Sequence, residues 1–250
     1  MARCRVVVLC LLVLVLVPGA ALAGGQNLNW DDCVLASSNV KQFACNTNVG
    51  FDVLVGSFEP FVTVSDMTGI EAAIDLIFRD GYVPPWWQTQ SGGCRIGGPI
   101  VNGVFTAQQT ACTDPWQSQA SGGSVTVVPG FQGNAARLRI TVSMAVPNGV
   151  TLVVNPGTVY YGYQLLIRHG STVGGACAGC EIPAIIVPAY TRLVSASNND
   201  QYLYPTLDGT GWMCWQCRCG YDDAGLYFDP ACAVTAIPNH TWGSIKTLYR

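Results

Sequence analysis

The stretch ARLRITVSMA at residues 136–145 decides the fold class, because apolar and polar side chains alternate along it. Its regularly spaced apolar members are Leu138, Ile140, Val142 and Met144. Successive side chains of a strand point to opposite faces, so a period of two predicts a strand with one buried face. In a helix the same residues would scatter around the cylinder.

The same period runs through residues 70–79, interrupted at Ile77, and through residues 161–168. Shorter strands are expected at 53–58, 61–64, 124–128, 150–154 and 185–194. Pro188 places the last of these at a sheet edge or a bulge, because proline has no amide hydrogen for the ladder.

Turn signals separate these strands: Gly122-Gly123, Pro129-Gly130, Asn148-Gly149, Pro156-Gly157 and Asp208-Gly209. Alternating apolar and polar residues indicate strands with one buried and one solvent-facing side, which favours antiparallel pairing. We therefore expect an all-β fold, a two-layer antiparallel β-sandwich of jelly-roll type, with a closed barrel as the alternative. One short helix is expected at the C-terminal end, where Trp242, Ile245, Leu248 and Tyr249 recur at helical spacing.

Residues 1–23 have the pattern of a secretory signal peptide. Arg3 and Arg5 precede an apolar run, and Ala21-Leu22-Ala23 supplies a small-residue cleavage site. The run is shorter than the ~20 residues that span a bilayer, and no later stretch resembles a membrane span. We expect cleavage after Ala23, a single β-sandwich domain over residues 24–250, and an extracellular or periplasmic location.

The full chain has 250 residues, of which 50% are hydrophobic and 11% charged. Without residues 1–23 it keeps 10 Lys and Arg against 15 Asp and Glu, a net charge of −5. So few cations do not neutralise a row of phosphates, which excludes nucleic acid as an expected partner.

The exported part retains 10 of the 12 cysteines, an even number that predicts disulfides in an oxidising compartment. Proximity suggests two pairs, Cys33 with Cys45 and Cys94 with Cys112. The remaining six are expected to pair among themselves: Cys177, Cys180, Cys214, Cys217, Cys219 and Cys232. Two Cys-x-x-Cys segments, at 177–180 and 214–217, leave zinc binding and a redox-active pair as alternatives.

No catalytic motif stands out. The sequence contains neither a Gly-x-Ser-x-Gly elbow nor a His-Glu-x-x-His pair. His169 is interpreted as a strand-end residue, and His240 lies in a glycosylation sequon. Carboxylates that would serve a glycoside hydrolase are Asp31, Asp32, Glu59, Glu71, Asp75, Asp222 and Asp223. The favoured interpretation of Glu71 and Asp75 is the solvated face of an outer strand.

Trp86 and Trp87, after Pro84-Pro85, are the candidate ligand-binding residues, since an exposed indole makes a platform for a sugar ring. Core packing is the alternative. Asn198, Asn199, Asp200, Asp208 and the Asp222-Asp223 pair offer oxygen ligands, but they lack the spacing of a calcium loop. No cofactor is therefore expected, with calcium and zinc as the alternatives.

Several segments together resemble a group of secreted bacterial proteins with no assigned activity. They are LNWDDC at 28–33, FACNTN at 43–48, VLVGSF at 53–58, PPWWQ at 84–88, Cys94-Arg95, ACAGC at 176–180 and TWGSIKTLYR at 241–250. The resemblance implies one exported domain with a docked C-terminal segment and carries over no catalytic residue. The Cys-rich stretch 214–219 departs from the group and leaves the disulfide pattern open.

The sequence thus favours a non-enzymatic exported module that binds an extracellular glycan or another surface component, or that serves a structural role. The alternative is a secreted carbohydrate-active hydrolase that uses two carboxylates. An exposed tryptophan beside paired carboxylates would favour the enzyme.

Overall fold

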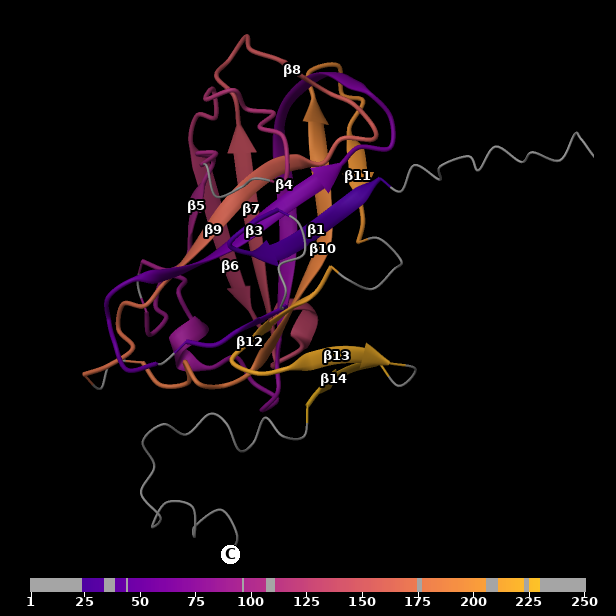
Figure 1. Cartoon of the computed structure of the whole chain (residues 1–250). Coiled ribbons are helices and arrows are strands. Elements are labelled where there is room, and N and C mark those ends of the chain that lie inside the picture. Colours follow the sequence, from indigo (N-terminus) through magenta and orange to yellow (C-terminus); the bar gives the residue numbers. More distant parts are fainter. Residues whose placement is uncertain are drawn as a thin grey trace, which may run out of the picture.

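Alternating strands pair into two facing sheets in the computed structural model (Figure 1). The structure describes residues 24–33, 39–43, 45–95, 97–106, 111–174, 177–205, 211–222 and 225–229. The expected signal peptide, the C-terminal helix, His240 and Cys232 lie outside these ranges.

The smaller sheet has the strand order β1-β3-β9-β5, in which all pairs are antiparallel. Its strands are β1 (Gly25–Trp30), β3 (Phe51–Glu59), β9 (Tyr160–Arg168) and β5 (Ile100–Asn102). β3 and β9 run along each other from Phe51 opposite Arg168 to Phe58 opposite Tyr160. The start of β3 and the end of β9 therefore meet at one end of the sandwich.

The larger sheet has the order β2-β12-β10-β4-β7-β6. Its strands are β2 (Val40–Lys41), β12 (Met213–Trp215), β10 (Ala184–Ser195), β4 (Val64–Phe78), β7 (Arg137–Ala145) and β6 (Gly123–Pro129). β8 (Leu152–Val154) also pairs with β4, and β11 (Gln201–Leu203) with β10. Within this sheet β2 and β12 are parallel. β13 (Cys219–Asp222) and β14 (Gly225–Phe228) form a separate hairpin.

The core lies between the sheets, whose strands cross in Figure 1. Leu54, Phe58 and Leu165 from the smaller sheet share one buried cluster with Ile70 and Ile140 from the larger. The alternating apolar residues of 136–145 are all inside it, because β7 turns one face inward. The prediction of an antiparallel β-sandwich is confirmed.

Several predicted strands are present with shifted ends, and one is not. Residues 61–63 precede β4 instead of forming a strand. Pro188 lies at a bulge, where the register between β10 and β4 shifts before Tyr190. β4 is a central strand between β10 and β7, so its interpretation as an outer strand is wrong. The short β1 was missed because Gln26 and Asn29 break its apolar pattern, although both are buried.

Candidate functional site

Three of the disulfides join segments that are distant in sequence, and a fourth is local. The bonded pairs are Cys33–Cys112, Cys45–Cys180, Cys94–Cys177 and Cys214–Cys219, and Cys217 is also disulfide-bonded. The predicted pairs Cys33–Cys45 and Cys94–Cys112 are therefore wrong, because folding brings residues 79 and 83 positions apart together instead.

Neither Cys-x-x-Cys segment forms an internal pair or presents free thiolates. Cys177 and Cys180 bond to two different partners, Cys94 and Cys45, so the prediction that the last six cysteines pair among themselves is wrong. Cys214 bonds to Cys219 rather than to Cys217. The zinc and redox alternatives for these segments are overturned, because zinc requires free thiolates and a redox-active pair requires its two cysteines to bond to each other.

The paired tryptophans lie inside the sandwich. Pro85 begins a 3-10 turn, Pro85–Trp87, that directs both indoles inward, with exposed fractions of 0% for Trp86 and 1% for Trp87. Trp86 stacks on Trp215 at 5.5 Å between ring centroids, and Trp87 meets the same ring edge-on at 5.3 Å. Neither ring offers a free face to a sugar, which corrects their interpretation as a ligand platform and favours the alternative of core packing.

Asp75 is the buried member of the carboxylate set among the side chains that the structure describes, which do not include Asp222 and Asp223. It accepts hydrogen bonds from Arg139 at 2.8 and 2.6 Å and from Arg137 at 2.5 Å. Burial acts to raise its pKa, but the two arginines outweigh burial and lower it below the ordinary value of 3.8. This is opposite to the shift that a general acid requires. The solvated-face interpretation of Asp75 is also wrong.

Other carboxylates in the described part of the chain are likewise engaged in local structure. Glu71 accepts a hydrogen bond from the Tyr190 hydroxyl at 2.8 Å, and Glu59 accepts one from the Gly157 amide at 3.0 Å. Asp200 pairs with Arg192 and accepts a hydrogen bond from the Ser195 amide. Within the described ranges no three His, Cys, Asp or Glu residues gather as a metal site.

His169 follows β9 directly and is buried. This agrees with its interpretation as a strand-end residue, and both ring nitrogens have hydrogen-bond partners. Its Nε2 lies 2.9 Å from Asp52 Oδ2 and its Nδ1 lies 3.0 Å from the Val49 carbonyl oxygen. The imidazole stacks on Phe43 at 3.5 Å between centroids. Asp52 also faces Lys41 Nζ at 3.5 Å. The cluster fixes the loop before β3 against the end of β9.

Beside this cluster, the end of the sandwich contains a cavity of about 510 Å³, within the size range of small-ligand sites. Its charged lining consists of Arg95 and Arg168, and Asn48 and Ser171 add polar groups. None of the described residues that line it is acidic. The Asn48 side chain is fixed, since its Oδ1 accepts the Thr172 and Val173 amides.

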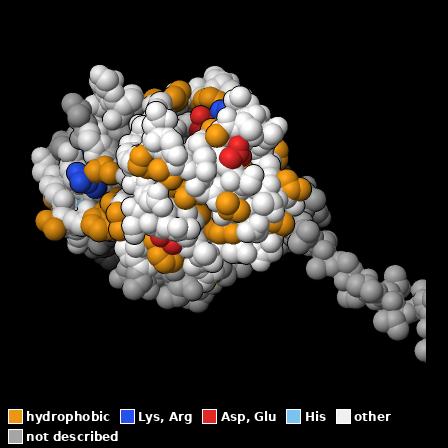
Figure 2. All heavy atoms as spheres, turned by 90° about the horizontal axis from the view of Figure 1, so that it is seen from above, with side chains coloured by type: hydrophobic (Ala, Val, Ile, Leu, Met, Phe, Trp, Pro, Cys, Tyr) orange, Lys and Arg blue, Asp and Glu red, His pale blue; other side chains and the backbone are white. Residues whose placement is uncertain are grey.

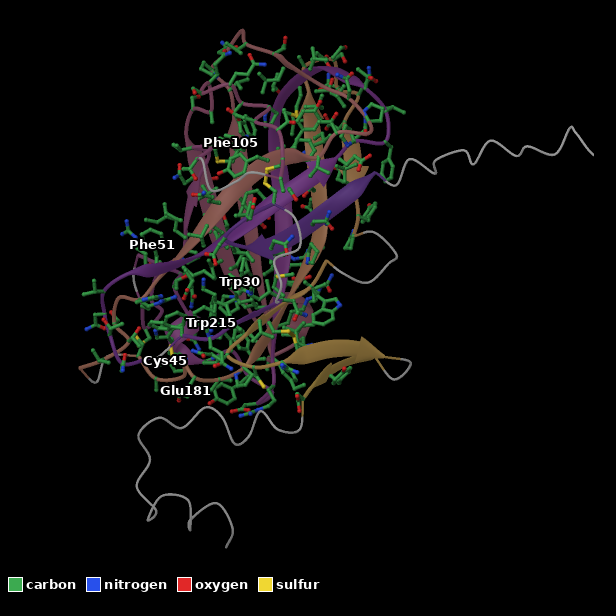
Figure 3. All side chains as sticks on the ribbon, in the orientation of Figure 1. Trp30, Cys45, Phe51, Phe105, Glu181 and Trp215 are labelled. Carbon is green, nitrogen blue, oxygen red and sulfur yellow. A yellow bond between two sulfur atoms is a disulfide. The ribbon has the colours of Figure 1, made fainter. Side chains whose placement is uncertain are left out.

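Glycines leave much of the cavity wall as bare backbone. Gly50, Gly97 and Gly170 line it, and a Cβ placed on Gly97 or Gly170 would meet nothing within 4 Å. Phe51, the first residue of β3, completes the lining and is 54% exposed. Figure 3 shows Phe51 at the outside of the molecule, whereas Trp215 lies within its lower end. The exposed aromatic ring at this cavity is therefore that of Phe51, not that of Trp86 or Trp87.

Two disulfides hold the lining loops in place. Cys94 precedes Arg95 and bonds to Cys177, while Cys45 lies three residues before Asn48 and bonds to Cys180. The single segment 177–180 thus anchors two of the loops that line the cavity. A preformed site of this kind loses less conformational entropy when a ligand binds.

A second cavity, of about 310 Å³, lies between the edge strands β5 and β6. Its wall contains Val101, Phe105 and Met144 and no charged residue. Figure 2 shows that apolar side chains on the face seen there are scattered and that charged ones are few. The cavity with the two arginines is the more specific candidate, because its polar groups converge.

No protein-family model and no curated protein matches the chain. Among solved structures, it is similar to a cohesin module of a family 33 glycoside hydrolase from Clostridium perfringens, with 8% identity over 76% of this chain and 93% of that chain and a TM-score of 0.30. A chain of a type I cohesin–dockerin complex from Clostridium thermocellum gives 10% identity, 76% and 91% coverage, and a TM-score of 0.32. At these values neither similarity transfers a partner or activity.

Sequence reasoning missed Arg95, Arg168 and the glycines of the cavity. The sequence pattern marks Arg168 only as the end of an alternating strand and Arg95 only as the neighbour of Cys94. One signal was present: the chain after residue 23 has few cations, and Arg95 lies next to a cysteine and just before Gly97-Gly98. That combination indicates a loop that is anchored by a disulfide and that exposes its backbone at the glycines.

Proposed function

We propose that the protein is exported and acts outside the producing cell as a non-enzymatic β-sandwich module that binds its ligand in the cavity lined by Arg95 and Arg168. The supporting observation is the cavity itself, whose lining loops are held in place by the disulfides Cys45–Cys180 and Cys94–Cys177. The disulfide content is consistent with secretion. Among the described residues, no helix combines the length and apolar character needed to cross a bilayer.

A binding role fits the chemistry of the site better than hydrolysis. The cavity offers guanidinium, amide, hydroxyl and backbone groups, with a half-exposed Phe51 ring at its side. No pair of carboxylates lines it, so the two-carboxylate mechanism has no acid or base there. An extracellular glycan or another surface component is the ligand class we propose, with Phe51 as the apolar contact.

A glycan and surface-polymer array tests this proposal. Gly170→Val should abolish binding of any captured ligand, because the new side chain enters open cavity space without a steric conflict in the fold. Thr151→Val, which replaces a hydroxyl with a methyl group at an exposed position outside the cavity, serves as the control. Binding that survives Gly170→Val would contradict the assignment of this cavity. Secretion is checked separately by locating the processed protein.

A further inference from the structure

The charges of the molecule are placed unevenly. The chain after residue 23 carries a net charge of −5, yet the cavity at the end of β9 is lined by two arginines and by no acidic residue. A concave site with one sign of charge and low-dielectric walls concentrates ligands of the opposite sign. The lining of the cavity thus has a charge opposite to that of the chain after residue 23.

Arg95 is the unusual member of this pair, because its guanidinium is buried without a carboxylate. The residue is 3% exposed, and its Cζ lies 3.5 Å from the centroid of the Trp86 ring. Its Nη1 donates to the Arg168 carbonyl oxygen at 2.5 Å. Its Nε and Nη2 are buried and have no hydrogen-bond partner in the structure.

An unpaired buried charge is costly unless acceptors and an opposite charge are supplied. Burial lowers the pKa of Arg95 to about 10, which still leaves the guanidinium charged at neutral pH. The donors that lack partners belong to a planar fork that matches the two oxygens of an oxyanion. An oxyanion that enters the cavity would supply the charge and the acceptors that the fold does not, once the guanidinium turns so that Nε and Nη2, which are closed off from solvent here, face it.

Arg168 supports the same ligand class. Its carbonyl oxygen fixes Arg95, and its side chain is exposed at the cavity. Asp52, which pairs with Ile167 in the strand register rather than with Arg168, is engaged with His169 and Lys41. Bare backbone at Gly97 and Gly170 leaves room for an anionic group to approach both arginines. Both arginines thus line the same cavity.

We propose that this cavity binds an oxyanionic group, a carboxylate, sulfate or phosphate carried by the ligand, with Arg95 as the buried anchor and Arg168 as the exposed clamp. The inference rests on the proposed function and specifies the chemistry of its ligand. The neutral polar and glycine surfaces around the arginines would contact the uncharged remainder of that ligand.

Titration calorimetry of the disulfide-intact protein with four probes tests the proposal: an oligogalacturonate, the matching neutral galactose oligomer, sodium sulfate and sodium phosphate. At least one anionic probe should bind, and the neutral oligomer should bind at least tenfold more weakly than the oligogalacturonate if the carboxylate is the recognised group. Preferential binding of sulfate or phosphate identifies those anions instead. Added NaCl should weaken the interaction, because salt screens the charge.

Two substitutions make the test specific. Arg168→Gln should weaken binding of the anionic probe by about tenfold to a hundredfold, the range of one charged hydrogen-bonding group. Arg79→Gln removes the same charge from an exposed position outside the cavity and should leave the affinity within about twofold of the unsubstituted protein. Arg168 is exposed, so its substitution leaves the core intact.

Two results would overturn the inference. One is that no anionic probe binds at up to about 10 mM, a concentration that reveals even weak sites. The other is equal binding of charged and neutral oligomers that Arg168→Gln does not change. If Gly170→Val still abolishes that neutral binding, the cavity remains the site of the proposed function and only its anionic specificity fails.

Discussion

At the scale of single residues, the ion pairs of Asp75 show how a polar group is accommodated in the middle of a sheet. Asp75 on β4 lies opposite Arg139 on β7 in the strand register, and Arg137 is two residues away on the same face. Cross-strand placement therefore brings both guanidinium groups to one buried carboxylate. The arrangement neutralises a charge that would otherwise be strongly destabilising.

Asp75→Asn should lower the free energy of unfolding by about 1–3 kcal/mol, because two partly buried arginines lose their anionic partner. Urea denaturation at neutral pH measures this. Asp80→Asn, which disrupts the exposed pair with Arg79, is the control and should change stability by less than about 1 kcal/mol. Equal effects of the two substitutions would contradict a special role of the buried pair.

Acid should weaken the same interaction. Because the folded pKa of Asp75 lies below the ordinary value of 3.8, the pair stabilises the protein fully above that value, and its contribution is lost as the pH falls through the folded pKa. The stability difference between the native protein and Asp75→Asn should therefore shrink at acidic pH. Denaturation curves collected from pH 7 down to about pH 2 check this expectation. A difference that stays constant would contradict it.

Two buried tryptophans provide a matched comparison of hydrogen bonding. Trp116 Nε1 donates to the Gly162 carbonyl oxygen at 2.9 Å, whereas Trp87 Nε1 is buried without a partner. Trp116→Phe leaves a buried acceptor unsatisfied, while Trp87→Phe removes an unsatisfied donor. We expect Trp116→Phe to cost about 1–3 kcal/mol more in unfolding free energy. Similar losses for both variants in chemical denaturation would refute this explanation.

At the scale of elements, the disulfides differ mainly in the length of chain that they close. Cys45–Cys180 spans 135 residues and ties the loop before β3 to the segment before β10, whereas Cys214–Cys219 spans only 5. A crosslink between distant positions restricts the unfolded chain more than a local one. The long-range bond should therefore contribute more to stability.

Replacing both cysteines of the Cys45–Cys180 pair by alanine should cost about 5 kcal/mol, against about 2 kcal/mol for the Cys214–Cys219 pair, on the chain-entropy model. Thermal and chemical unfolding of the two double variants measures the difference. If the local pair proves the more important, strain or packing rather than loop closure governs these bonds.

At the scale of the whole molecule, the disulfides tie both sheets and their loops into one framework. Peptide mapping of the unreduced protein should recover the crosslinks Cys33–Cys112, Cys45–Cys180, Cys94–Cys177 and Cys214–Cys219. All ten cysteines after residue 23 are expected to be oxidised, so the intact mass should be about ten hydrogens below that of the reduced protein. A crosslink between Cys33 and Cys45, or free thiols with stoichiometric zinc, would contradict this framework.

The fold class was predictable because it depends on local patterns. Alternation in 136–145 and 161–168 dictates strands with a buried face, and glycine at Gly130, Gly149 and Gly157 adopts positive φ at the expected turns. Strands without such alternation, such as β1 with its buried Gln26 and Asn29, escaped prediction. Their polar side chains are hidden by neighbours that the local sequence does not reveal.

The sequence by itself determined the β-sandwich and the even set of cysteines available for crosslinking, since both follow from residue type and spacing. Only the tertiary structure decided which cysteines meet, that Trp86 and Trp87 are buried, and that Arg95 and Arg168 line one cavity. The physical reason is that these properties depend on long-range strand pairing. Registers such as Phe51 opposite Arg168 bring together residues more than a hundred positions apart.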